Sequence, residues 1–187
     1  MRITTPIKTL LAALILIGAQ IAQGNDNIII DDFSTESKVI WNYFSDQVMG
    51  GVSEGSARLG AENGEDYAHL TGDVSTANNG GFIQLRTSLR TGVDKDAMGI
   101  YVKVRGNLQK YYIHLRTRGT MLPWQYYQAE FDVTKDWQVI RLPLDSFNAS
   151  GSWLRKRVLP TSLRSIGIVA YGRNHSADLQ VSEIGFY

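Results

Sequence analysis

The stretch Asp46-Gln47-Val48-Met49-Gly50-Gly51-Val52-Ser53 places a carboxylate and a hydroxyl on either side of two adjacent glycines. Paired glycines allow positive φ angles and let the backbone approach another group closely. Asp46 and Ser53 could hydrogen-bond the amides of the loop itself, or the hydroxyl groups of a ligand. Two interpretations stay open: a binding loop, and a structural turn that Asp46 locks with Met49 as a core plug.

Two further stretches combine turn-forming residues with groups suited to recognition. The segment Asn78-Asn79-Gly80-Gly81-Phe82 is first of all a tight turn into a strand, although exposed Asn amides also suit sugar hydroxyls. The segment Pro123-Trp124-Gln125-Tyr126-Tyr127 sets a Trp beside tyrosines, an arrangement typical of carbohydrate or protein recognition. Burial of these rings at the end of a sandwich explains the second segment equally well.

The sequence offers little for catalysis. The chain has no cysteine, which excludes a thiol nucleophile and a cysteine metal site, and its three histidines lack metal-ligand spacing. No Gly-x-Ser-x-Gly or His-Glu-x-x-His motif occurs, and the glycine loop lacks the ending of a phosphate-binding loop. Asp46 and Glu130 can be paired as hydrolytic carboxylates, but nothing makes that pair specific. We therefore predict that the protein is not an enzyme and has no catalytic residue and no cofactor.

Carboxylates near the two ends of the chain are the remaining metal candidates. Terminal strands of sandwiches often lie close together, so Asp31, Asp32 and Glu183 could meet around a structural Ca²⁺ ion. Ordinary hydrogen bonds that secure the strand ends explain these residues more simply. We predict no metal site.

Composition limits the kind of fold that positions these groups. With 43% hydrophobic and 20% charged residues, the chain is not disordered. A net charge of +1 gives no support for a nucleic-acid binder. Abundant glycine, 18 of 187 residues, and 10% aromatic residues favour short strands and tight turns over helices.

Apolar and polar residues alternate with a period of two along much of the chain, which is the pattern of half-buried strands. We expect strands at 28–30, 67–74, 82–87, 99–105, 111–117, 126–133, 138–142, 165–171 and 179–186. The best helical candidate is a short piece at 144–147. Many short strands separated by turn signals predict an all-β sandwich or jelly roll, in one domain over residues 27–187.

Four of these strands could present one polar face. If the aliphatic rows of 82–87, 99–105, 111–117 and 126–133 fill the core, the alternate rows share the opposite surface. That surface would carry Phe82, Gln84, Arg86, Tyr101, Lys103, Tyr112, His114, Arg116, Tyr126, Gln128 and Glu130. Flat rings mixed with Arg, Gln and Glu suit a polar ligand with apolar faces. The alternative is a solvated face with cross-strand Arg–Glu pairs, each of which contributes little.

Residues 1–24 have the layout of a secretory signal peptide. A basic start at Arg2 and Lys8 precedes an apolar run, and Ala22-Gln23-Gly24 offers a cleavage site before Asn25. The apolar run is short for a membrane span of ~20 residues, although an uncleaved N-terminal anchor is the alternative. Loss of Arg2 and Lys8 lowers the net charge from +1 to −1. We predict an exported product, periplasmic or extracellular, with no transmembrane segment in the mature chain.

Short motifs run through nearly the whole mature chain in one order. They are Asp32-Phe33, Trp41 with the glycine loop 46–53, Asn79-Gly80-Gly81-Phe82 with Arg86, Gly99-Ile100, Val104-Arg105-Gly106, Tyr112, Leu115-Arg116-Thr117, Tyr127-Gln128-Ala129-Glu130-Phe131, Trp137, Arg141-Leu142-Pro143-Leu144, Phe147, Ser165-Ile166-Gly167-Ile168 and a closing strand at 179–184. In this order they resemble the complex I intermediate-associated protein 30 family. The loop Asp-x-Val-Met-Gly-Gly-x-Ser is the most specific part of the match.

The resemblance implies a galactose-binding-like jelly-roll β-sandwich. It also implies a role like that of the mitochondrial chaperones in the family, which help to build respiratory complex I and are not enzymes. The chain departs from those members because it carries an export signal where they carry a matrix address. The fold therefore transfers to this chain, whereas the partner does not.

Two binding functions remain. One is an exported module that grips a protein partner during assembly of an envelope or membrane complex, and the other is a carbohydrate-binding module that uses the aromatic face. For either function, the candidate contacts are Asp46, Met49, Gly50, Gly51, Ser53, Asn79, Arg86, Arg116, Tyr127 and Glu130. The two arginines would fork onto carboxylate or hydroxyl groups. Tyr127 shares a row with core residues and is included because the family motif contains it.

Overall fold

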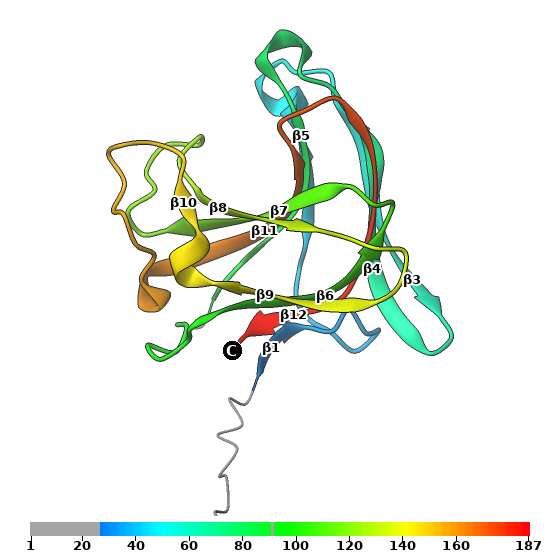
Figure 1. Ribbon diagram of the computed structural model, residues 1–187, viewed down its shortest axis with the longest axis horizontal. Helices are drawn as coiled ribbons and strands as arrows, with labels where there is room; N and C mark the ends of the chain where they lie inside the picture. Colours follow the sequence, from blue (N-terminus) through cyan, green and yellow to red (C-terminus); the bar gives the residue numbers. More distant parts are fainter. Residues whose placement is uncertain (1–26, 91) are drawn as a thin grey trace, which may run out of the picture.

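The computed structural model describes residues 27–90 and 92–187, and these residues form two antiparallel β-sheets that pack face to face (Figure 1). This described part contains no α-helix. Its short 3-10 turns cover Asp46–Met49 (η1), Ala77–Asn79 (η2), Leu144–Ser146 (η3) and Pro160–Ser162 (η4). None of its helices is long and apolar enough to cross a membrane. The predicted signal peptide, residues 1–24, lies outside the described residues.

Each sheet joins strands that are far apart in the sequence. Sheet A has the order β3 (Glu54–Glu62), β4 (Glu65–Val74), β12 (His175–Phe186), β6 (Gly99–Gly106) and β9 (Gln138–Pro143), and β1 (Ile28–Asp31) pairs with β12. Sheet B has the order β10 (Asn148–Ala149), β8 (Tyr127–Asp132), β7 (Lys110–Thr117), β11 (Leu163–Tyr171), β5 (Phe82–Ser88) and β2 (Asn42–Ser45). Such crossovers between two sheets are typical of jelly-roll sandwiches.

The core lies between the sheets and is built from every second residue of the central strands. Tyr111, Ile113 and Leu115 of β7 and Ile166 and Ile168 of β11 have no exposed surface. Each fully buried Leu or Ile side chain contributes about 1.5–3 kcal/mol. The inward rows therefore hold the two sheets together and direct the alternate residues of sheet B outward.

The strands predicted from alternation all form, and the all-β sandwich is confirmed. The helical candidate at 144–147 is the 3-10 turn η3. Three strands were not predicted, and each gives a weak signal. β2 has only 4 residues, β10 has 2, and β3 alternates poorly because its largest apolar residue, Leu59, points to solvent.

The expectation that strand 99–105 shares a face with 82–87, 111–117 and 126–133 is wrong. β6 lies in sheet A between β12 and β9, whereas β5, β7 and β8 belong to sheet B. Tyr101 and Lys103 therefore belong to the other sheet. Alternation determines which residues share one face of a strand, but it carries no information on which strands are neighbours.

Asp31 secures the end of β1 by ordinary hydrogen bonds. Its Oδ1 accepts the N–H of Phe33 at 2.9 Å, and its Oδ2 accepts the indole N–H of Trp41 at 2.6 Å. Within residues 27–90 and 92–187, no group of three His, Asp or Glu side chains is placed to hold a metal ion.

Candidate functional site

Asp46 lies at a corner where η1, the start of β3 and the start of β5 meet, and it has no exposed surface. Its carboxylate accepts the Ser53 N–H at 2.9 Å, the Ser53 hydroxyl at 2.5 Å, the Gly81 N–H at 2.5 Å and the Phe82 N–H at 3.3 Å. Burial by itself raises the pKa of this carboxyl, but the hydrogen bonds outweigh burial and the pKa is lowered. We call this arrangement the Asp46 corner.

The glycines of the two motifs leave room for this carboxylate. A Cβ on Gly51 would lie 2.4 Å from Asp46 Oδ1, and a Cβ on Gly80 would lie 2.3 Å from Asp46 Oδ2. Gly50 and Asn79 have φ angles of 92° and 58°, which place both in the left-handed region that Gly and Asn tolerate best. The spacing of Asp, Gly and Asn in both stretches is thus explained by one buried acceptor.

The polar side chains Asp46 and Ser53 of the corner are hidden from solvent, whereas Met49, Gly50 and Asn79 are exposed. Ser53 is fully buried, and its hydroxyl also accepts the Ser75 N–H at 3.0 Å. Met49 is 62% exposed, so the interpretation of Met49 as a core plug is wrong. Val48 beside it is exposed as well. Tyr127, the remaining aromatic candidate, is buried in the core between the sheets.

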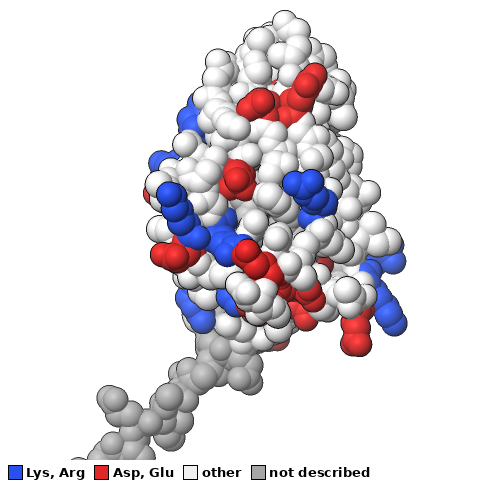
Figure 2. Space-filling model, turned by 90° about the vertical axis from the view of Figure 1, so that its right-hand side faces the viewer, with Lys and Arg blue, Asp and Glu red and all other residues white. Residues whose placement is uncertain are grey.

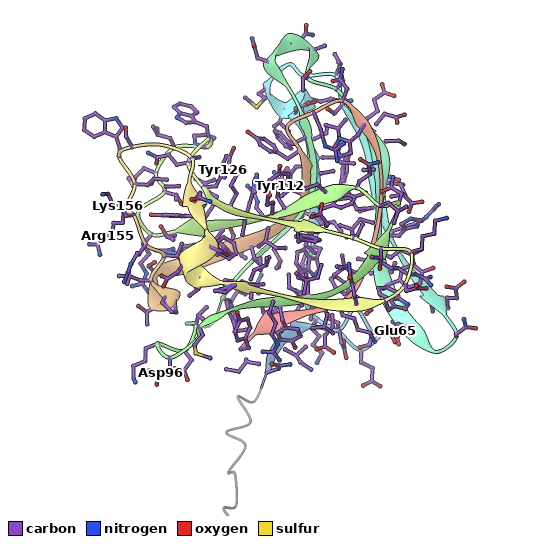
Figure 3. All side chains as sticks on the ribbon, viewed as in Figure 1. Glu65, Asp96, Tyr112, Tyr126, Arg155 and Lys156 are labelled. Atoms are coloured by element: carbon purple, nitrogen blue, oxygen red, sulfur yellow. The ribbon has the colours of Figure 1, made fainter. Side chains whose placement is uncertain are left out.

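The outer face of sheet B is the second candidate surface, and the strand register gives its map. One row across the sheet is Glu130, Tyr112, Val169, Gln84 and Phe44, and the next is Gln128, His114, Gly167, Arg86 and Asn42. We define the tyrosine face by its outward side chains, which are Phe44, Phe82, Gln84, Arg86, Tyr112, His114, Arg116, Tyr126, Gln128, Glu130 and Tyr171. Figure 3 shows Tyr112 and Tyr126 on the same side of β7 and β8.

Rings gather at the centre of the tyrosine face. His114 stacks on Tyr126 with ring centroids 4.1 Å apart and an interplanar angle of 9°. Tyr171 meets the rings of His114 and Tyr112 edge-on at 5.4 Å and 5.6 Å. The Tyr126 and Tyr171 hydroxyls form a hydrogen bond of 3.0 Å. Val169 is completely buried although it points away from the core, in the row that also holds Tyr112.

Burial controls the ionisation of these groups. Burial lowers the pKa of His114 to about 3, and the neighbouring Gln128 side chain only partly opposes this shift, so the imidazole is neutral. Burial, followed by the Tyr171 hydroxyl and its charge, raises the pKa of Tyr126. His114 Nε2 and Gln128 Oε1 are buried and make no hydrogen bond with any described residue.

Two arginines on this face have no acidic partner among the described residues. Arg86 lies over the ring of Phe44 at 4.4 Å, and Arg116 donates to the carbonyls of Thr120 and Leu122 at 3.2 Å and 3.0 Å. Burial, followed by the charge of Arg116, lowers the pKa of Arg86. Glu130, in contrast, pairs with Lys110 at 2.8 Å.

The outer face of sheet A is different, because two of its cations, Lys103 and Arg105, pair with acidic side chains of the same face. Lys103 pairs with Glu65 at 2.5 Å, and Arg105 pairs with Glu62 and lies over the ring of Trp137 at 4.7 Å. Figure 2, which views the side of β3 and β4, shows acidic and basic atoms close together. The ring of Trp137 on sheet A is thus covered by the protein's own Arg105, so sheet A offers a weaker candidate surface.

The structure divides the predicted contact residues into three groups, of which the first is Tyr127 alone, in the core. Arg86, Arg116 and Glu130 lie on the tyrosine face. The Asp46 corner holds Asp46, Met49, Gly50, Gly51, Ser53 and Asn79. Sequence reasoning missed Tyr171 and Phe44, which complete the face. Tyr171 could have been predicted, because alternation places it on the opposite side of its strand from the inward residues Ile166, Ile168 and Ala170.

A cavity of about 600 Å³ lies outside both regions. It is lined mainly by residues 28–30, 38–40, 87–90 and 92–94. Among the described residues, its lining contains one aromatic ring, that of Phe186, and no tyrosine or tryptophan, so it offers less ring surface to a sugar than the tyrosine face does. The tyrosine face therefore remains the better candidate.

Comparisons with known proteins agree with this architecture. Residues 31–181 match the family model described as complex I intermediate-associated protein 30 (CIA30). A search of curated proteins found no match. The fold is similar to that of the family 11 carbohydrate-binding module of the cellulosomal cellulase Lic26A-Cel5E of Clostridium thermocellum, with a TM-score of 0.68, 16% sequence identity, and coverage of 86% of this chain and 93% of that chain.

Two further solved structures show the same likeness. A family 11 module from Clostridium thermocellum in complex with a β-1,3-1,4-mixed-linked tetrasaccharide has a TM-score of 0.68 at 16% identity, covering 86% of this chain and 94% of that chain. A family 30 carbohydrate-binding module has a TM-score of 0.62 at 14% identity, covering 86% of this chain and 98% of that chain. At these identities the likeness establishes the β-sandwich fold alone.

Proposed function

The chain belongs to the complex I intermediate-associated protein 30 family, and from this premise we propose that it is a non-catalytic binding domain whose ligand docks on the tyrosine face. The observation that carries the proposal is the ring cluster of Tyr112, His114, Tyr126 and Tyr171, beside two arginines that lack acidic partners among the described residues. Polar groups that the fold leaves without a counter-charge are available to a ligand.

A carbohydrate is the ligand that this chemistry suits best. A sugar ring has an apolar C–H face, which stacks on aromatic rings, and an edge of hydroxyls, which needs directed hydrogen bonds. The rings of Tyr112 and Tyr126 provide the stacking surface, and the guanidinium groups of Arg86 and Arg116 provide the directed hydrogen bonds. The likeness to carbohydrate-binding modules supports this choice at the level of the fold.

The Asp46 corner has a supporting role in this proposal. Its carboxylate binds the N–H groups of Gly81 and Phe82, where β5 begins. β5 carries Arg86, so the corner positions one side of the face without contacting the ligand itself. This role accounts for a specific motif whose carboxylate is completely buried.

Binding of soluble oligosaccharides tests the proposal. A panel of neutral and acidic oligosaccharides is titrated calorimetrically into the chain that starts at Asn25, after a cooperative melt has been recorded. Tyr126→Ala should weaken binding by about 30-fold or more, the loss typical of a central aromatic contact. The matched control is Tyr67→Ala on the outer face of sheet A, where Arg105 covers the ring at 5.9 Å.

The outcomes are distinct. Retained affinity in Tyr67→Ala together with lost affinity in Tyr126→Ala supports the tyrosine face. Equal losses in both variants, or unchanged affinity in Tyr126→Ala, contradict it. A folded protein that binds no member of the panel contradicts the carbohydrate assignment.

A protein partner is the second candidate, and membership of the family favours it. Under this hypothesis the module binds a protein subunit during assembly of an envelope or membrane complex, and Arg86 and Arg116 pair with carboxylates of that subunit. A photo-crosslinker at Tyr112 should capture one defined partner in stoichiometric yield, and Arg116→Glu should abolish the capture. A crosslinker at Tyr67 provides the control. Equal capture from Tyr67, or capture unaffected by Arg116→Glu, contradicts this version.

Export of the protein is proposed on sequence grounds. The basic start and apolar run of residues 1–24 favour secretion with cleavage before Asn25. Mass spectrometry of the protein from its native host should find a chain that begins at Asn25. An intact Met1 would support the uncleaved anchor instead.

A further inference from the structure

Two loops at one end of sheet B expose large apolar side chains. The first loop follows β7 over residues 118–125, and the second follows β10 over residues 150–158. In Figure 1 they extend beyond the sheets on the side of β8 and β10. Trp153 is 94% exposed, Met121 is 82% exposed and Trp124 is 63% exposed, and Leu122 is exposed as well. We call these two segments the tryptophan loops.

The tryptophan loops are held in place by the fold. Thr120 donates its hydroxyl to the Thr117 carbonyl at 2.8 Å, and Gln125 Oε1 accepts the N–H groups of Met121 and Leu122 at 2.8 Å and 3.0 Å. In the second loop, Leu154 and Val158 are buried in the core. The outward position of the apolar residues is therefore built into the loops.

Ser150 joins the two loops. Its hydroxyl donates to the Trp124 carbonyl at 3.0 Å and accepts the Tyr126 N–H at 3.0 Å. Trp124 and the segment that leads to Trp153 are thus parts of one surface. Anchored loops that leave such side chains in water lose the stabilisation that burial would provide, which favours a partner that covers them.

Basic residues surround these apolar side chains. Arg118, Arg155, Lys156 and Arg157 are exposed, and neither loop contains an acidic residue. Figure 3 shows Arg155 and Lys156 projecting from this end. Among the described residues, the one ion pair of this group joins Arg157 to Asp145 at 3.9 Å, and both side chains are largely exposed, so it neutralises little charge. Since the whole chain has a net charge of only +1, this excess of positive charge is local.

We infer that the tryptophan loops dock on the surface of an anionic lipid bilayer. Tryptophan favours the headgroup layer, and Met121 and Leu122 project where they reach the boundary of the acyl chains. Arg118, Arg155, Lys156 and Arg157 then lie among the lipid phosphates. This inference does not depend on which ligand occupies the tyrosine face.

The shape and charge of the surface favour a bilayer over a macromolecular partner. A protein partner usually inserts an anchor side chain into a pocket. The tryptophan loops instead project outward, and they line neither of the cavities of about 600 and 360 Å³. A general nucleic-acid binder carries a broad positive field, which a chain of net charge +1 lacks.

Vesicle sedimentation tests the inference. The chain from Asn25 onward retains every described residue, and therefore both sheets and the core between them, and a cooperative melt confirms that each variant is folded. It is mixed with vesicles of phosphatidylcholine alone, and with vesicles in which part of this lipid is replaced by phosphatidylglycerol. We expect binding to the anionic vesicles only, weakened by salt, and a blue shift of tryptophan fluorescence.

Variants locate the contact. Arg155→Gln, Lys156→Gln and Arg157→Gln together should lower the partition coefficient on the order of 100-fold, because each basic residue near an anionic surface contributes about fivefold. The charge-matched control replaces Lys38, Lys95 and Lys135 by Gln. Trp124→Ala with Trp153→Ala should remove the blue shift, whereas Leu59→Ala with Val139→Ala should preserve it.

Several results would overturn the inference. They are equal binding to both kinds of vesicle, equal loss in the charge-matched control, and a blue shift that survives without Trp124 and Trp153. Binding of single-stranded DNA that depends on the loops, with no binding of anionic vesicles, would assign the surface to nucleic acid instead.

Discussion

The Asp46 corner and the tyrosine face differ in how the protein uses their polar atoms. In the corner, each carboxylate oxygen of Asp46 is occupied by the protein's own donors, and no surface of this side chain reaches solvent. On the tyrosine face, Arg86 and Arg116 have no acidic partner among the described residues, and the buried His114 Nε2 accepts no hydrogen bond from them. The buried polar groups of the first region are satisfied by the protein itself, whereas the second region has polar groups without a partner among the described residues.

This difference shows that a specific sequence motif can be explained by internal hydrogen bonding alone. A buried carboxylate with several donors demands particular residues around it, since a Cβ at Gly51 or Gly80 would overlap it. Such demands produce a strict local pattern. A binding face is assembled from single residues on several strands, and it leaves only weak local patterns.

The largest effect is expected for Asp46→Ala. The substitution leaves the N–H groups of Ser53, Gly81 and Phe82 without their acceptor, which should lower the free energy of unfolding by about 3–5 kcal/mol. Urea denaturation followed by tryptophan fluorescence measures this loss. A loss below about 1 kcal/mol combined with abolished ligand binding would show that Asp46 is itself a ligand contact.

Gly80→Ala should give the next effect. Its Cβ would lie 2.3 Å from Asp46 Oδ2, and overpacking at a buried site costs about 1–3 kcal/mol. The control is Gly92→Ala, where a Cβ meets no atom within 4 Å. Thermal melts of both variants provide the comparison. An unchanged melting temperature in Gly80→Ala would mean that the Asp46 corner accommodates the added methyl group without loss of stability.

Lowering the pH should destabilise the fold, because His114 of the tyrosine face is buried as the neutral imidazole. Burial lowers the pKa of His114 from its ordinary value of 6.5 to about 3 in the folded protein, so between these pH values the unfolded chain binds a proton that the folded ring does not. The free energy of unfolding should fall as pH decreases through this window, by up to about 1.4 kcal/mol per pH unit. His114→Gln should flatten the slope, measured by urea denaturation at several pH values. An equally steep slope in His114→Gln would assign the acid sensitivity to other groups.

The smallest effect is expected for Met49→Ala. Its side chain is 62% exposed, so the free energy of unfolding should change by less than about 0.5 kcal/mol. Ligand affinity should also stay the same, because Met49 lies in the Asp46 corner and not on the tyrosine face. Weaker binding in this variant, measured by calorimetry, would extend the ligand site to the corner.

Much of the fold was predictable because burial acts on each strand separately. Residues such as Ile113 and Ile168 alternate with outward residues over a whole strand, and this period is visible in the sequence. The short β2 and the largely exposed β3 lack that signal. For the same reason, Tyr112, His114 and Arg116 could be assigned to one row, whereas the partners of that row could not be known.

The sequence by itself determined the all-β class, the inward and outward rows, and the motifs of the family. Each depends on residues close together along the chain, where sterics and burial act locally. The tertiary structure alone decided that β6 leaves the predicted face and that β11 brings Tyr171 to it. It also decided that the distant Gly81 joins Ser53 of the same loop as a hydrogen-bond donor to the buried Asp46 carboxylate. Pairing between distant strands depends on the packing of the whole core, and no local period records it.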